Sequence, residues 1–110
     1  MSLRAGLVFS WAAGTLLALP ATAQDITLGR ARAQIACAMC HGVDGIATLP
    51  SAAHLAGQPA IYLEEQLKAY RSGKRAHEVM GVIAKTLSDD DIRHLAAWYS
   101  AMKITVEPPP

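Results

Sequence analysis

The stretch Cys37-Ala38-Met39-Cys40-His41 contains both cysteines of the 110-residue chain, and a histidine directly follows the second one. Four kinds of chemistry use such spacing. The two thiols form a redox dithiol, a short structural disulfide or half of a zinc site. With the histidine, they make the Cys-x-x-Cys-His signature by which c-type haem is attached. The rest of the chain decides among these hypotheses.

The first three hypotheses find little support. A thioredoxin-like dithiol belongs to a strand–helix–strand unit, whereas a helical pattern precedes these cysteines and no strand pattern is evident. The other histidines, at positions 54, 77 and 94, lack the three-to-five-residue spacing of a zinc pair. A disulfide across two residues would constrain the unfolded chain little. Haem attachment uses all three reactive side chains, with Cys37 and Cys40 as thioethers and His41 as the proximal iron ligand.

Met80 is the expected ligand on the other face of the iron. Met39 lies inside the motif, on the side of His41, and Met102 lies at a core position of the last predicted helix. Met80 lies in an irregular segment between two helices, where the chain can wrap a cofactor and present its sulfur. His77, three residues earlier, is the competing ligand, and a His/His iron would have a lower reduction potential than a His/Met iron.

Residues 1–23 have the pattern of a secretory signal peptide. Arg4 supplies the positive start, and the uncharged run from Ala5 to Leu19 is shorter than the about 20 residues of a membrane-spanning helix. Ala21-Thr22-Ala23 is a small-x-small cleavage site. We therefore expect export to a bacterial periplasm, with no stable membrane insertion once the signal peptide is removed. Haem attachment agrees with this location, because bacteria complete it outside the cytoplasm.

The composition excludes some partners. Ten basic and nine acidic residues give a net charge of +1, so the chain lacks the basic face of a nucleic-acid binder. We expect one small domain over residues 24–103 and a flexible proline-rich tail over residues 104–110. A domain this small with 5% aromatic residues is well suited to a cofactor that fills its middle.

The domain is predicted to consist of helices joined by loops, without strands. Three helix starts are predicted, with Asp25 and Ser88 as N-caps and Pro59 as the first residue of its helix. Asp91 stands where it completes a capping box with Ser88. A glycine-containing loop over residues 42–57 follows the motif, and a short helical turn is expected after Met80.

Taken together, these features resemble the class I c-type cytochromes over the whole mature domain. The similarity is closest to the short periplasmic type, including single halves of tandem dihaem cytochromes. HLAGQPAIYLEEQLKAYRSGKR (54–75) and LSDDDIRHLAAWYSAM (87–102) carry it beside the cysteine motif. The resemblance implies an all-α cytochrome c fold, with three to four helices around one covalent haem. It also implies that the first and last helices cross nearly perpendicularly, with Gly29 facing Leu95 and Trp98.

Two positions depart from the family pattern. The family usually has a proline two residues before the leucine that matches Leu55, and the carbonyl of that proline orients the proximal histidine. This chain has Ala53 there. Ala33 stands where an aromatic residue often packs near the haem edge, and Trp98 is expected to fill that space.

The resemblance implies a periplasmic carrier of single electrons, not an enzyme, with haem c, iron ligated by His41 and Met80, and redox proteins as partners. Two alternatives stay open. One is a haem-bearing subunit of a periplasmic dehydrogenase complex. The other is a five-coordinate haem protein that binds a gas or peroxide, in which Met80 is not bound to the iron.

Overall fold

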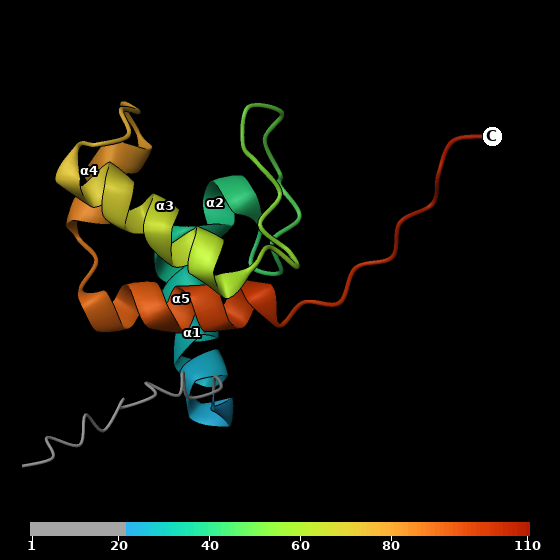
Figure 1. Ribbon diagram of the computed structural model, residues 1–110, viewed down its shortest axis with the longest axis horizontal. Coiled ribbons are helices and arrows are strands. Elements are labelled where there is room, and N and C mark those ends of the chain that lie inside the picture. Colours follow the sequence, from blue (N-terminus) through green and yellow to red (C-terminus); the bar gives the residue numbers. More distant parts are fainter. Residues whose placement is uncertain (1–21) are drawn as a thin grey trace, which may run out of the picture.

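The computed structural model describes residues 22–110, which form five helices and no strand (Figure 1). The helices are α1 (Ala23–Ala36), α2 (Ala38–His41), α3 (Ala60–Ser72), α4 (Met80–Lys85) and α5 (Asp89–Ser100). The predicted all-α fold is confirmed. None of the helices in this part of the chain combines the length and the apolar character needed to cross a membrane. Residues 1–21 of the predicted signal peptide lie outside the described residues.

The described residues form more helices than the expected three to four, because the first predicted helix breaks at Cys37. This residue has φ −124° and ψ −31°, outside the α-helical values, although its N–H still bonds the carbonyl of Ala33 at 2.9 Å. Ala38–His41 then form the separate single turn α2. The cysteine motif therefore spans the end of one helix and a short turn that follows it.

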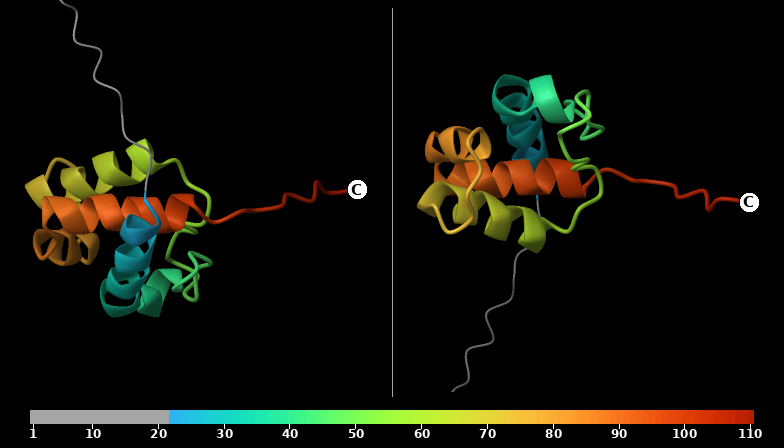
Figure 2. Two further views of the ribbon diagram at one scale, coloured as in Figure 1. Left: turned by 90° about the horizontal axis from the view of Figure 1, so that it is seen from below. Right: turned by 90° about the horizontal axis from the view of Figure 1, so that it is seen from above.

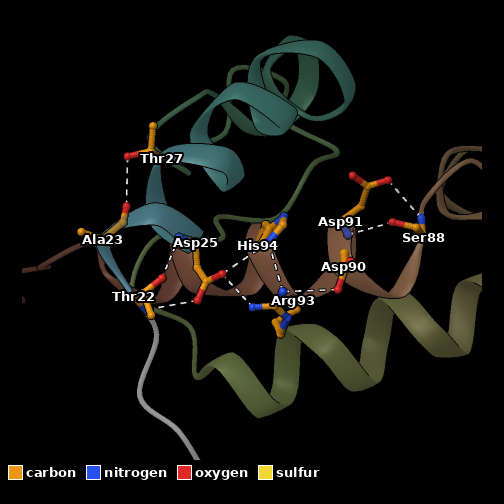
Figure 3. Close-up of polar contacts among 9 residues, drawn as sticks. All are labelled: Thr22, Ala23, Asp25, Thr27, Ser88, Asp90, Asp91, Arg93 and His94. Atoms are coloured by element: carbon orange, nitrogen blue, oxygen red, sulfur yellow. Dashed lines mark hydrogen bonds and ion pairs between the residues drawn. The ribbon is translucent and has the colours of Figure 1, made fainter.

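Two of the three predicted helix starts differ from the structure. Thr22, not Asp25, is the N-cap of α1, because Asp25 is the acidic third residue of a capping box (Figure 3). The Thr22 hydroxyl accepts from the Asp25 N–H, and the Asp25 carboxylate accepts from the Thr22 N–H, both at 3.1 Å. Pro59 precedes α3 as its N-cap instead of being its first residue. The capping box of Ser88 and Asp91 is confirmed, with both hydrogen bonds at 3.0 Å (Figure 3).

α1 crosses α5 at a steep angle, as the resemblance implies (Figure 1). Gly29 lies at the crossing, where a Cβ atom would collide with the carbonyl of His94 and lie 2.7 Å from the Cβ of Trp98. Near the start of α1, Asp25 Oδ1 accepts from Arg93 Nη1 at 2.7 Å and lies 3.3 Å from His94 Nε2 (Figure 3). The close approach thus requires a glycine, and the ion pair of Arg93 and Asp25 joins the two helices beside it.

α3 runs alongside α5 (Figure 2), and the buried core gathers around α5. Its members are Ala33, Leu63, Leu87, Ile92, Leu95, Ala96 and Tyr99. Three side chains of α5, those of Leu95, Ala96 and Tyr99, also line the cavity described next. The last helix therefore contributes to both the core and the candidate site.

Candidate haem site

A largely apolar cavity lies between the cysteine motif, the loop over residues 42–57 and the helices α3, α4 and α5. Its empty volume is about 860 Å³, the open solvent at its mouth included. The large apolar side chains that line it are Leu55, Leu63, Leu67, Ile83, Leu87 and Leu95. No Asp or Glu stands among the described residues of the lining. Such a lining suits a large apolar ligand that is fixed by few polar groups.

Three of the four predicted haem-binding residues line this cavity, namely Cys37, His41 and Met80. Met80 is half-buried and is the first residue of α4. The short helical turn expected after Met80 is therefore confirmed. Cys40 lies in the same turn as His41 but is not part of the lining. Its carbonyl accepts from the N–H of Thr48 at 3.0 Å, which ties the following loop to the motif.

His41 is held by a backbone acceptor. Its Nδ1 lies 2.7 Å from the carbonyl oxygen of Ala53. A carbonyl oxygen can only accept, so Nδ1 carries the proton and Nε2 has the lone pair that a metal requires. Ala53 thus provides the contact that the family usually obtains from a proline. This bond fixes both the tautomer and the orientation of the ring.

The loop after the motif is shaped by Gly42 and Tyr99. Gly42 has φ 74°, and a Cβ there would collide with the carbonyl of Ile46. The Tyr99 hydroxyl donates to the carbonyl of Gly42 at 3.1 Å. Burial raises the pKa of Tyr99, so this hydroxyl stays protonated and remains a donor. The core helix α5 therefore anchors the chain directly after His41.

Trp98, which was expected near the haem edge, makes contacts with the loop after the motif and with α1. Its indole Nε1 donates to the carbonyl of Val43 at 2.6 Å, and the guanidinium of Arg30 lies 5.8 Å from its ring centroid. Trp98 is absent from the described lining of the cavity. The indole reaches a carbonyl of the loop and packs beside the crossing of α1 and α5, so its direction is set away from the cavity.

The environment of Cys37 argues against a redox dithiol. Burial raises the pKa of its thiol to about 11, although the charge of Arg32 acts in the opposite direction. A reactive dithiol requires a lowered pKa, because the thiolate is the nucleophile. A zinc site is also unsupported, since no group of three His, Cys, Asp or Glu within residues 22–110 is placed to hold a metal ion. The imidazole, thioether and two thiols present here fit a covalently attached haem.

His77, the competing ligand, serves another purpose. Its Nδ1 accepts from the backbone N–H groups of Val79 and Met80, both at 3.2 Å. Its ring packs edge-on to Tyr70 with centroids 6.1 Å apart. His77 is absent from the described cavity lining. Its contacts support the backbone from which Met80 projects.

The polar residues of the lining that were not predicted include His54 and Arg75. His54 Nδ1 accepts from the N–H of Ala47 at 2.8 Å, a contact within the loop. Both residues lie in irregular segments, where no periodic pattern marks the side that faces a ligand. They stand at the two ends of the family-like stretch over residues 54–75, and this was the one available signal.

The chain has recognisable relatives. Residues 24–98 match the family model described as cytochrome c oxidase, cbb3-type, subunit III. A cytochrome c-554(548) of Halomonas halodenitrificans is 44% identical over 70 residues, which cover 61% of this chain and 84% of that protein. A cytochrome c4 of Pseudomonas aeruginosa is 36% identical over 91 residues, which cover 83% of this chain and 45% of that protein.

A solved structure agrees with these relatives. The cytochrome c4 of Acidithiobacillus ferrooxidans superposes with a TM-score of 0.67 at 30% sequence identity, covering 71% of this chain and 49% of that one. The chain thus spans about half the length of the cytochrome c4 proteins that it matches. From the family match, the shared helical fold and the cavity beside a Cys-x-x-Cys-His motif, we conclude that this chain belongs to the c-type cytochromes, which carry covalently bound haem c.

Proposed function

We propose that the protein carries single electrons through a haem attached to Cys37 and Cys40 and ligated by His41 and Met80. The main supporting observation is that His41 and Met80, which the whole of α3 separates in the sequence, line one apolar cavity. When bound, the haem iron supplies a one-electron Fe(III)/Fe(II) couple. Six-coordinate ligation leaves no open position for a substrate, which suits a carrier.

Each residue has a distinct role in this proposal. Cys37 and Cys40 bind as thioethers and therefore take no part in thiol redox chemistry. The Ala53 carbonyl orients the His41 ring, and the Met80 thioether favours the reduced iron and so raises the potential. The leucine-rich lining excludes water and also favours the less charged, reduced state.

We also propose that the carrier works in the periplasm. The basis is the signal-peptide pattern of residues 1–23, followed by the domain over residues 24–103 and the tail over residues 104–110. A c-type cytochrome acts with redox partner proteins, and a periplasmic donor and acceptor are the partners that this location implies.

Visible absorption of the purified holoprotein tests the ligation. The oxidised wild type should show the weak far-red band of Met-ligated haem, and Met80→Ala should lose it. Met102→Ala is the matched control and should keep the band, since Met102 lies beyond the end of α5 and outside the described lining. Carbon monoxide should bind reduced Met80→Ala but not the reduced wild type. Ready binding by the wild type would instead support a five-coordinate haem.

A second candidate is a permanent subunit of a periplasmic dehydrogenase complex. Exposed apolar side chains beside the motif favour it: Ile35 is 79% exposed and Met39 is 88% exposed, and Ile46 and Leu49 are exposed as well. Where such side chains form one continuous patch, the patch marks a protein interface. Gel filtration of a native periplasmic extract, followed by detection of the haem, separates the two candidates. A carrier elutes at the size of the single chain, whereas a subunit comigrates with a larger protein.

A further inference from the structure

We infer that Arg75 binds one of the two propionate carboxylates of the haem. This inference rests on the proposed placement of the haem between His41 and Met80. Arg75 belongs to the cavity lining, and it lies in the turn between α3 and α4, five residues before Met80. Within the described lining it is the one side chain with a permanent charge.

Two side chains of α3 hold the guanidinium of Arg75 at the cavity. Its Nη1 donates to Gln66 Oε1 at 2.7 Å, and its central carbon lies 4.6 Å from the ring centroid of Tyr70. The Arg75 backbone N–H also donates to the carbonyl of Ala69 at 3.1 Å. Gln66 and Tyr70 line the cavity as well. These contacts fix the guanidinium at the cavity, which reduces the side-chain entropy lost when it pairs with a carboxylate.

Most other arginines in residues 22–110 already have a carboxylate partner. The pairs within 4 Å are Arg32 with Asp91, Arg71 with Asp89, and Arg93 with Asp25 and Asp90. Arg30 has none in this part of the chain, but it lies over Trp98 and is not part of the described lining. Arg75 combines the two properties that a propionate requires, since it borders the cavity and has no carboxylate partner among the described residues.

The charge of the ligand completes the argument. Haem has two carboxylates, and a carboxylate at an apolar cavity is unfavourable unless it is paired. The described lining contains no Asp or Glu that would compete for the cation. With Nη1 engaged by Gln66, the guanidinium keeps Nη2 and Nε as donors for a carboxylate. Arg75 is exposed to solvent, which places the pair at the mouth of the cavity.

A pair of variants tests this assignment. Arg75→Gln removes the cation, and Lys74→Gln removes the same charge from the adjacent residue, which is exposed and outside the described lining. The propionate pKa is followed by the pH dependence of the haem resonances in NMR spectra, and the midpoint potential is measured by redox titration. We expect Arg75→Gln to raise the propionate pKa and lower the midpoint potential more than Lys74→Gln does, because a paired cation stabilises the carboxylate and the reduced iron. Equal effects of the two variants would overturn the inference.

A measurement on the wild-type holoprotein does not depend on how the variants fold. In the reduced, diamagnetic protein, nuclear Overhauser contacts should join the Arg75 side chain to the methylene protons of one propionate. Their absence would also overturn the inference. The far-red band recorded on the same samples separates the two proposals. Suppose that all samples keep the band while Arg75→Gln and Lys74→Gln show the same propionate pKa and midpoint potential. In that case the propionate assignment fails and the ligation by Met80 stands.

Discussion

The Nδ1 atom of His41 lies 2.7 Å from the carbonyl oxygen of Ala53, twelve residues further along the chain. The acceptor belongs to the backbone, so its presence does not depend on the side chain at position 53. The loop brings the carbonyl into place through its own hydrogen bonds, among them Leu55 N–H to the carbonyl of Gly45 at 2.8 Å. A proline is therefore one way to build this contact, and an alanine in a well-held loop is another.

Ala53→Pro tests this interpretation. The Ala53 N–H donates no hydrogen bond within the described residues, so a proline removes none and keeps the carbonyl. We predict an unchanged far-red band and a free energy of unfolding that is equal or higher by up to about 1 kcal/mol, because proline restricts the unfolded chain. Absorption and denaturant unfolding measure the two quantities. Loss of the band would show that the loop cannot hold the pyrrolidine ring of a proline at position 53 and keep the hydrogen bond to His41.

Gly29→Ala should destabilise the protein by roughly 1–3 kcal/mol, because the new methyl group would force α1 and α5 apart. The Cβ would lie 2.7 Å from the Cβ of Trp98 and closer still to the His94 carbonyl. Ala31→Ser adds one heavy atom at an exposed position of the same helix and should stay within about 0.5 kcal/mol of the wild type. Denaturant unfolding of both oxidised variants gives the comparison. Equal stabilities would mean that the crossing is not tightly packed.

The ion pair of Arg71 and Asp89 should make stability depend on pH. The hydrogen bond and charge of Arg71 lower the pKa of Asp89 below the ordinary value of an aspartate. A group with a lowered folded-state pKa stabilises the protein above its unfolded pKa, and this contribution is lost as the pH falls through the folded value. Asp89→Asn should therefore be less stable than the wild type at neutral pH, and the difference should vanish in acid.

Asp90→Asn is the matched control, since Asp90 lies in the same first turn of α5 and has a 3.3 Å contact with Arg93. The control accounts for the loss of a negative charge near the positive end of the helix dipole. Denaturation midpoints across the pH range should differ from the wild type more for Asp89→Asn than for Asp90→Asn. The same loss in both variants would mean that the Arg71–Asp89 pair adds no more stability than the Arg93–Asp90 contact.

Much of the fold was predictable, because the longer helices have local sequence signals. Ser88 with Asp91 predicted the start of α5, and their capping box is present in the structure. The break at Cys37 was not predictable, since nothing in the sequence signals its φ of −124°. Thr22 lies before the expected cleavage site after Ala23, and so outside the domain predicted to begin at residue 24.

The site was predictable to the extent that it follows a motif. Cys37 and His41 come from a five-residue signature, and Met80 follows from the position of the methionines relative to the helices. The direction of Trp98 and the placement of Arg75 depend on tertiary contacts with distant residues, namely Val43 for the indole and Gln66 for the guanidinium. Such contacts leave no pattern in a single sequence.

The most direct test of the central claim, that Met80 completes the iron coordination, is the proton NMR spectrum of the reduced holoprotein. The methyl group of a bound methionine lies over the haem ring, whose ring current shifts its signal far upfield. We predict one such methyl signal in the wild type, in Met39→Leu and in Met102→Leu, and none in Met80→Leu. A wild-type spectrum without this signal, or a signal that persists in Met80→Leu, would contradict the account.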